Sequence, residues 1–414
     1  MGYSATKIGQ LTFAEQSEWG SPAGSGFTGI ECEVPSFDFP TSMEVPDNLR
    51  SNFFDPAPLQ GHNAGGTLSF KFRMQGLHTS GALLSDNPTA NADAKLMKLA
   101  LGGQVIGGYD SPGIGSGSTA TSWNTVDGSL YGIGRGVIAS KTVSGVDKYG
   151  FGVVKSVSTN AVTMLYPTAQ VPDSGSKTFG TVTSFSSNAQ ANPVTFRWAG
   201  AQTGQFFEIS DCVCTSATIE SEPGGWLSCT MEFTCGKWTH STSGAAAGVT
   251  TGTQYLPVCI GYQGASLGYH VENVTSSVQE TAVGSVSFTI ENEYTPINTF
   301  SANQGVYQYA LTNRSFTMSS TISYDQWSSP SLDSIVGKTY PATHYETLRF
   351  EVGNTPGNML AIVMPRVYYS KFTPEDVNGI MGISWEAKAM QHTADAGDAS
   401  TTSAADSAFR VIMA

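Results

Sequence analysis

Residues 213–233 read VCTSATIESEPGGWLSCTMEF, and residues 367–387 read VYYSKFTPEDVNGIMGISWEA. The second stretch matches the first without a gap, because identical residues recur at one spacing of 154 positions. The four identities are Val213 with Val367, Ser216 with Ser370, Gly225 with Gly379, and Glu232 with Glu386. A match of this kind indicates an internal repeat.

Both stretches have the pattern of a β-hairpin. In the first, apolar and polar residues alternate from Leu227 to Thr234, which is the period of a strand with one buried face. The second alternates in the same way from Met381 to Lys388. EPGG in the first copy and PEDVNG in the second separate the two arms as turns. The sequence therefore predicts a duplicated β-hairpin.

Two strand-like blocks also recur in the same order before the hairpins. VPSFDF (34–39) resembles SVSFTI (285–290), and LSFKFRM (68–74) resembles RSFTMSS (314–320). The aligned residues are Phe37 with Phe288 and Phe39 with Ile290 at a spacing of 251, and Phe70 with Phe316 at a spacing of 246. Matched blocks in one order are expected of a duplicated domain.

A short helix is predicted after these strands in each half. Leu96, Leu99 and Ala100 of ADAKLMKLALGG lie on one helical face, and the helix is expected to stop at the glycine pair that begins at Gly102. SPSLDSIVGK (329–338) has the same spacing of apolar residues before a glycine. Each half therefore reads strand, strand, helix, hairpin.

The first half holds about 80 residues that the second lacks, since the spacing falls from about 235 at the helix to 154 at the hairpin. These residues lie between 105 and 190 and are rich in Gly and Ser. Within them, two alternating arms flank a turn at Ser158 to Asn160. Because long loops without structure of their own are uncommon, we predict a small β subdomain inserted at 105–190.

Composition also favours strands and turns. Of 414 residues, 46 are glycine and only 13% are charged. We predict an all-β fold with short helices, built as two tandem domains at 1–245 and 246–414. The second domain carries an Ala/Ser/Asp-rich stretch near the C-terminus. No apolar run approaches the ~18–20 residues of a membrane helix and no signal peptide is recognisable, so the protein is expected to stay where it is made.

No catalytic or metal site is predicted. The six cysteines lack the paired C-x-x-C spacing of structural zinc sites, and in a reducing compartment they are expected to be free thiols in strands. GASLG (264–268) matches G-x-S-x-G, but no strand-to-helix pattern surrounds it. The six histidines form no metal-binding pair by spacing. We expect neither enzyme activity nor a bound metal or cofactor.

The charge balance bears on nucleic acid. The chain has 20 Lys and Arg against 33 Asp and Glu, a net charge of −13. A protein that grips nucleic acid needs cationic residues to displace counterions. The composition fits a protein that must not hold nucleic acid, and equally one whose acidic charge only keeps it soluble.

Diffuse motifs follow one another over most of the chain, apart from the insert and the Ala/Ser/Asp-rich stretch. They are IGQLTFAEQSEWGSPAG (8–24), VPSFDFPTSMEVPDNLRS (34–51), AGGTLSFKFRMQG (64–76), LALGG (99–103), FFEISDCVCTSATIESEPGGWLSCTMEFTCGKW (206–238), SVSFTIENEY (285–294), LTNRSFTMSSTISYDQ (311–326) and MLAIVMPRVYYSKFTPEDVNGIMGISWEAKAM (359–390). In this order they resemble the major tail tube proteins of long-tailed bacteriophages.

The resemblance implies tube domains of two packed β-sheets, a sandwich or barrel with a flanking helix, that polymerise as stacked rings around a DNA channel. Such a protein belongs to the virion tail and is assembled in the cytoplasm of the host bacterium. Its partners would be other copies of itself and the tape measure, terminator and baseplate proteins. No membrane is involved, and the genome passes without specific binding. Two domains per chain would give a trimeric ring of six domains, with a hexamer of chains as the alternative.

Two other classes stay open. A related ring-forming tail protein, such as a terminator or a baseplate hub component, would share the fold and form single rings without tubes. A carbohydrate-binding β-sandwich is suggested by the aromatic and glycine content and would bind saccharides as a monomer.

Loops 40–65 and 291–312 are the candidates for contacts between stacked rings. They connect the two early strands of each half and are polar and longer than a hairpin needs. Within the first, Glu44, Asp47 and Arg50 are candidates for charge pairs at the ring rim.

Glu232 and Glu386 are the candidates for the channel wall, because they occupy matching positions on polar strand faces. A negative wall would repel DNA and keep it centred. The insert is expected on the outer surface, since about 80 residues projecting inward would block the passage.

Overall fold

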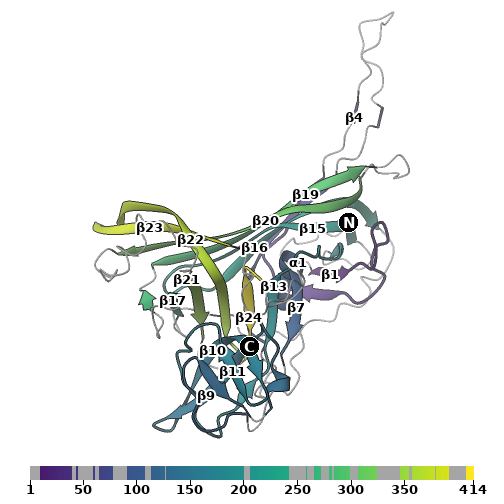
Figure 1. Cartoon of the computed structure of the whole chain (residues 1–414). Coiled ribbons are helices and arrows are strands. Elements are labelled where there is room, and N and C mark those ends of the chain that lie inside the picture. The colour runs from purple at the N-terminus through teal and green to yellow at the C-terminus, as the bar shows by residue number, and fades with distance from the viewer. Residues whose placement is uncertain are drawn as a thin grey trace, which may run out of the picture.

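The computed structural model describes residues 10–39, 43–44, 59–60, 65–77, 91–107, 113–125, 127–199, 206–241, 258, 265–271, 279–281, 284–298, 306–323, 346–353, 357–377, 379–390 and 407–414. Within these residues the protein is mostly β, with 65% strand and one α-helix (Figure 1). Ladders join 17 strands into one large antiparallel sheet, five form a smaller sheet, and two form a separate pair. The prediction of an all-β fold is confirmed at this level.

Eight strands of the large sheet form a continuous antiparallel band, which we call the ribbon. Its strands follow one another in space as β3 (Ser36–Asp38), β6 (Gly66–Arg73), β16 (Ser228–Ser241), β15 (Phe206–Ser221), β19 (Ser285–Asn298), β20 (Val306–Ser323), β23 (Ile380–Ala389) and β22 (Leu360–Val377). Its apolar face packs on the core, together with the helix α1 and shorter strands (Figure 1).

The two halves of the chain repeat the same strand pairings. In the first half β1–β2, β1–β14, β14–β15, β15–β16, β16–β6 and β6–β3 are paired. In the second half β17–β18, β17–β21, β21–β22, β22–β23, β23–β20 and β20–β19 are paired in the same way. The strands outside the ribbon are β1 (Gln10–Glu15), β2 (Thr28–Ile30), β14 (Val194–Ala199), β17 (Ala265–Val271), β18 (Gln279–Thr281) and β21 (Glu346–Val352). The ladder between β15 and β19 joins the halves.

Each hairpin contains a β-bulge at the corresponding place. The extra residue is Thr215 in the first hairpin and Ser370 in the second, since the register shifts between residues 214 and 216 and between 369 and 371. Thr215 and Ser370 are 155 positions apart, whereas Glu232 and Glu386 are 154 apart. The gap-free alignment is therefore wrong for the first arm, and Lys371, not Ser370, corresponds to Ser216.

The second hairpin is one residue shorter than the first between these matched pairs, and the difference lies in its turn. β22 runs to Val377 and β23 begins at Ile380, so most of the predicted PEDVNG turn is strand. EPGG of the first hairpin is a turn, as predicted, because β15 ends at Ser221 and β16 begins at Ser228.

The strand pairing also tests the two sequence matches that precede the hairpins, 34–39 with 285–290 and 68–74 with 314–320. Two rows of directly opposed residues correspond, namely Phe37, Leu68 and Phe233 in one half and Phe288, Met318 and Ala387 in the other. Phe233 and Ala387 are 154 positions apart, so the match of Phe37 with Phe288 is confirmed.

The match of Phe70 with Phe316 is wrong by four residues. Ser69 lies opposite Glu232 and Ser319 lies opposite Glu386, which sets the spacing of these strands at 250. A shift by an even number of residues leaves the same side chains on the buried face. The apolar pattern alone therefore could not detect the error.

The helix α1 (Ala92–Leu101) has the predicted bounds. The side chain of Asn91 accepts a hydrogen bond from the Ala94 N–H and caps the N-terminus at 2.8 Å. Gly102 ends the helix with φ 90°, and a Cβ there would lie 2.5 Å from the Ala189 carbonyl oxygen. No helix in the described part of the chain is long and apolar enough to span a membrane. The second predicted helix, at 329–338, lies outside the described residues.

The insert is a small β subdomain, as predicted. Its five-stranded sheet has the order β12 (Thr178–Phe179), β9 (Gly136–Val143), β10 (Val146–Ser158), β11 (Ala161–Met164) and β8 (Ser122–Asn124), with the 3-10 helix η1 (Gly128–Leu130) alongside. It has its own cluster of buried side chains around Trp123. The turn at residues 158–160 joins β10 and β11, as expected.

The predicted limits of the insert are too wide. β7 (Gly102–Ile106) and β13 (Val182–Ser186) pair with each other in the large sheet. The C-terminal strand β24 (Arg410–Met413) lies between β13 and β22, and Arg410 Nε donates a hydrogen bond of 3.1 Å to the Gly134 carbonyl. The insert is thereby attached on the side away from β19 and β20 (Figure 1).

Candidate functional site

One face of the ribbon is polar along its whole width, and we call it the polar face. Ladder positions place serine, threonine and charged residues in continuous rows across the strands, and these side chains are half-buried or exposed in the described chain. One row contains Arg73, Ser228, Glu220, Ser287, Ser319, Glu386 and Lys371. The opposite face carries the buried side chains of the core. This two-sided pattern is what a sheet between a core and water requires.

The structure brings Glu232 and Glu386 onto this face at corresponding positions. Ser69 and Ser216 lie directly opposite Glu232 on the two neighbouring strands, and Ser319 and Lys371 lie opposite Glu386. Their predicted placement on polar strand faces is therefore correct.

A hydroxyl at each bulge donates to the main-chain carbonyl of the facing glutamate, and Ser370 also donates to the carboxylate. Thr215 donates its hydroxyl to the Glu232 carbonyl at 3.2 Å. Ser370 donates to the Glu386 Oε1 at 2.6 Å, and Lys388 Nζ lies 3.7 Å from the same oxygen. Glu386 is therefore held locally, whereas the Glu232 side chain is exposed.

Acidic groups outnumber basic groups on the described part of the polar face. The carboxylates are Asp38, Glu220, Glu232, Glu291, Glu293, Glu375 and Glu386, and the cations are Lys71, Arg73, Lys371 and Lys388. Lys71 is paired with Glu220 at 2.6 Å, and this hydrogen bond and ion pair raise the pKa of Lys71 above its ordinary value. The face is therefore negative overall.

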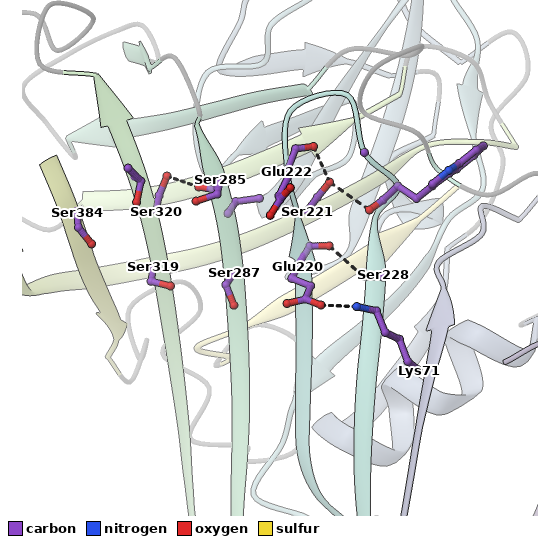
Figure 2. Close-up of a pocket in the computed structure, with 14 residues that line it drawn as sticks. Lys71, Glu220, Ser221, Glu222, Ser228, Ser285, Ser287, Ser319, Ser320 and Ser384 are labelled. Atoms are coloured by element: carbon purple, nitrogen blue, oxygen red, sulfur yellow. Dashed lines mark hydrogen bonds and ion pairs between the residues drawn. The ribbon is translucent and has the colours of Figure 1, made fainter. Parts of the chain in front are cut away.

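Two open grooves lie on this face. The first, of about 450 Å³, is lined by the Lys71–Glu220 pair, a series of serine side chains from five strands, and Trp226 (Figure 2). Trp226 is 44% exposed, and the Arg73 guanidinium lies 5.3 Å from its ring centroid. The second groove, of about 510 Å³, is lined by Glu232, Glu291, Glu293 and neighbouring polar residues. Among the described residues, no group of three or more His, Cys, Asp or Glu side chains is arranged to hold a metal ion.

The cysteines of the first hairpin are structural. Cys212, Cys214, Cys229 and Cys235 are free and buried in β15 and β16, as predicted. Burial raises the pKa of the Cys214 thiol to about 12, which keeps it protonated. Cys259 lies outside the described residues.

Four residues of the G-x-S-x-G match, 265–268, fall in a regular strand, and Gly264 lies outside the described residues. Residues Ala265–Val271 form β17, which pairs with β21 over its whole length. The strained strand-to-helix turn of a nucleophile elbow is not formed there.

The rim candidates are only partly described. Glu44 lies in β4 (Met43–Glu44), opposite Leu59 of β5 (Leu59–Gln60), whereas Asp47 and Arg50 lie outside the described residues. The predicted loop 291–312 is wrong in extent, because β19 continues to Asn298 and β20 begins at Val306. The connections β3–β6 and β19–β20 leave the ribbon at the same end.

Sequence reasoning missed the repeat of the strands outside the ribbon, in which β1, β2 and β14 correspond to β17, β18 and β21. VTFRWA (β14) and ETLRFEV (β21) correspond, and both have a register shift at the same place against β15 and β22. Arg197 and Arg349 occupy the same position and form ion pairs with Glu208 at 2.7 Å and Glu351 at 2.6 Å. The shared pattern Thr, apolar residue, Arg, aromatic residue was the available signal.

The chain matches no protein-family model, and no curated protein sequence is significantly similar to it. Its function is therefore inferred from its own residues and geometry, together with the resemblance of its motifs.

Proposed function

We propose that this chain is a structural virion protein that assembles into stacked rings and forms the tail tube of a long-tailed bacteriophage. The ribbon is the observation that carries the proposal, because it joins two copies of a four-strand unit edge to edge. In the described chain it begins at β3 and ends at β22, with no strand paired beyond either one along residues 36–38 and 368–377. Open edges of this kind favour pairing with further strands, and closure into a ring removes them.

Each four-strand unit, with the shorter strands beneath it, is one tube-type domain in this proposal. The first domain spans 1–245 and contains the insert, and the second spans 246–414. The repeated pairings and the repeated bulges support two domains of one design.

The width of the channel favours three chains in a ring. Three ribbons would supply 24 strands, which at ~4.8 Å spacing and ~40° tilt enclose roughly 50 Å between backbones. Six chains would enclose roughly twice that diameter. The smaller barrel admits a hydrated duplex and still guides it, so we propose a trimer with six domains.

The polar face lines the channel in this arrangement, and the core lies outside it. The excess of carboxylates, including Glu232 and Glu386, makes the wall negative, so DNA passes without the counterion release that would hold it. The insert is attached on the other side of the core from β19 and β20, which leaves it on the outer surface (Figure 1).

Negative-stain microscopy and native mass spectrometry of the purified chain test the proposal. We expect rings and stacked tubes, with a ring mass close to three times 43.6 kDa. The assembled tube, in this proposal, binds the tape measure, terminator and baseplate proteins. A chain that remains monomeric at high concentration would overturn the proposal.

Two alternatives are separated by the same experiment. A terminator or baseplate hub component would form single rings that never stack. A carbohydrate-binding module would stay monomeric and bind saccharides, and the groove beside the exposed Trp226 is the observation that favours this second candidate. Glycan binding by the monomer, abolished by Trp226→Ala, would support it.

A further inference from the structure

We propose that β22 of one chain pairs antiparallel with β3 of the next copy, in the register that β15 and β19 already use inside the chain. This inference rests on the proposed ring, and it names the two edges and the residues that meet between copies.

The internal junction is the template. Its opposed pairs are Thr218 with Thr289 and Glu220 with Ser287 on the polar face, and Ala217 with Ile290 and Ile219 with Phe288 on the apolar face. All four apolar residues are buried. The junction therefore combines hydroxyl and carboxylate pairs toward water with a dry apolar seam.

Because β22 corresponds to β15 and β3 corresponds to β19, the register of the internal junction predicts which residues of β22 and β3 would be opposed. Corresponding residues of β15 and β22 are 155 positions apart, as the bulges show. Corresponding residues of β3 and β19 are 251 positions apart, as the ladder rows show. The resulting pairs are Asp38 with Thr373, Ser36 with Glu375, Phe37 with Pro374, and Phe39 with Phe372.

Each transferred pair keeps the chemistry of its template. A serine again faces a glutamate, two polar residues again face each other, and two apolar pairs again lie on the core side. Phe37 and Phe39 stack on each other at 6.2 Å and pack at the margin of the core while partly exposed. Phe372 packs on Tyr369 at 5.5 Å and is also partly exposed. Pairing of the two strands would bury the aromatic side chains of Phe39 and Phe372 in an apolar seam like that of the internal junction.

Pro374 limits the new ladder without preventing it. Proline lacks a backbone N–H, so it removes at most one hydrogen bond between the strands. Proline on an edge strand also disfavours pairing with other strands. The edge therefore favours the partner whose side chains fit it.

Cysteine cross-linking tests the register in the intact chain. Cys32 lies close to β3 and is partly exposed, so all variants carry Cys32→Ser. The test variant is Asp38→Cys/Thr373→Cys, whose thiols would be directly opposed, with Cβ atoms about 4.5–5.5 Å apart. The matched control is Ser36→Cys/Lys371→Cys, which is four residues out of register and about 13 Å apart along the strands. Thr218→Cys/Thr289→Cys at the internal junction is the positive control.

After mild oxidation, the test variant should give covalent dimers and trimers on a denaturing gel. The out-of-register variant should give none, because a disulfide needs Cα atoms within about 7 Å. The internal pair should give a cross-linked monomer, identified by peptide mass spectrometry.

The outcomes separate the register from the proposed function. If rings form and the internal pair cross-links while the test pair does not, the register is overturned and the ring remains. Cross-linking of the out-of-register pair also overturns it. If the chain carrying only Cys32→Ser and the wild-type chain both stay monomeric, the proposed function fails as well.

Discussion

The two hairpins β15–β16 and β22–β23 share a bulge and a glutamate but differ in their neighbours. β15 lies between β16 and β19, and Ile219 is completely buried. At the corresponding place in β22, Pro374 is exposed. The two hairpins thus share one local design, and the adjoining strand decides whether their side chains enter the core.

The largest expected effect concerns this difference in burial. Ile219→Ala should lower the free energy of unfolding by about 2–5 kcal/mol, because it leaves a cavity between strands. Pro374→Ala in the unassembled chain should lower it by at most about 1 kcal/mol, through the flexibility of the unfolded state. Urea unfolding at low protein concentration measures both. Equal losses would show that positions 219 and 374 have the same environment in solution.

The next effect comes from an acid beneath the first hairpin. Asp93 of α1 is 6% exposed and accepts a hydrogen bond of 2.7 Å from the Gln75 N–H. Burial raises the pKa of Asp93 from 3.8 to about 7, with a smaller contribution from the charge of Glu31. Between these values the folded chain keeps a proton that the unfolded chain releases.

Stability should therefore fall by about 1.4 kcal/mol per pH unit from about pH 4 to pH 7 as a contribution of this one group. Asp93→Asn should remove this contribution to the pH dependence of the unfolding free energy, which urea unfolding between pH 4 and pH 7 measures. Asp147→Asn, at an exposed position of the insert, is the control and should keep it. An unchanged slope in Asp93→Asn would show that another group carries the pH dependence.

A third experiment tests what the hairpins share. Glu232→Lys/Glu386→Lys should make assembled tubes retain a duplex oligonucleotide about tenfold better at low salt, and added salt should release it. Glu232→Gln/Glu386→Gln changes size little and adds no positive charge, so it should not retain DNA. Filter binding of preassembled tubes measures the difference. Equal retention by the lysine and glutamine variants would place these residues away from the channel.

The smallest expected effect concerns the bulges. Thr215→Val and Ser370→Ala each remove a hydroxyl that bonds across the hairpin, and each should cost about 0.5–1 kcal/mol of unfolding free energy. Thr215→Ser keeps the hydroxyl and should be close to the wild type. A loss confined to one hairpin would mean that the two bulges differ in role.

Much of the architecture could be predicted from local sequence. The duplicated hairpin, the helix that ends at Gly102 and the β nature of the insert depend on alternation, capping and turn residues, which act over a few positions. The placement of Glu232 and Glu386 on polar strand faces followed from the same alternation.

Only the tertiary structure decided the register and the neighbours. Alternation repeats every two residues, so the match of Phe70 with Phe316 satisfied the pattern although the ladder sets it four residues away. The one-residue difference between the hairpins arises in the second turn, and only strand pairing locates it. The raised pKa of Asp93 likewise depends on what packs around it. Local sequence determines which residues can form a strand face, whereas hydrogen-bond ladders and core packing between distant segments determine which faces and edges meet.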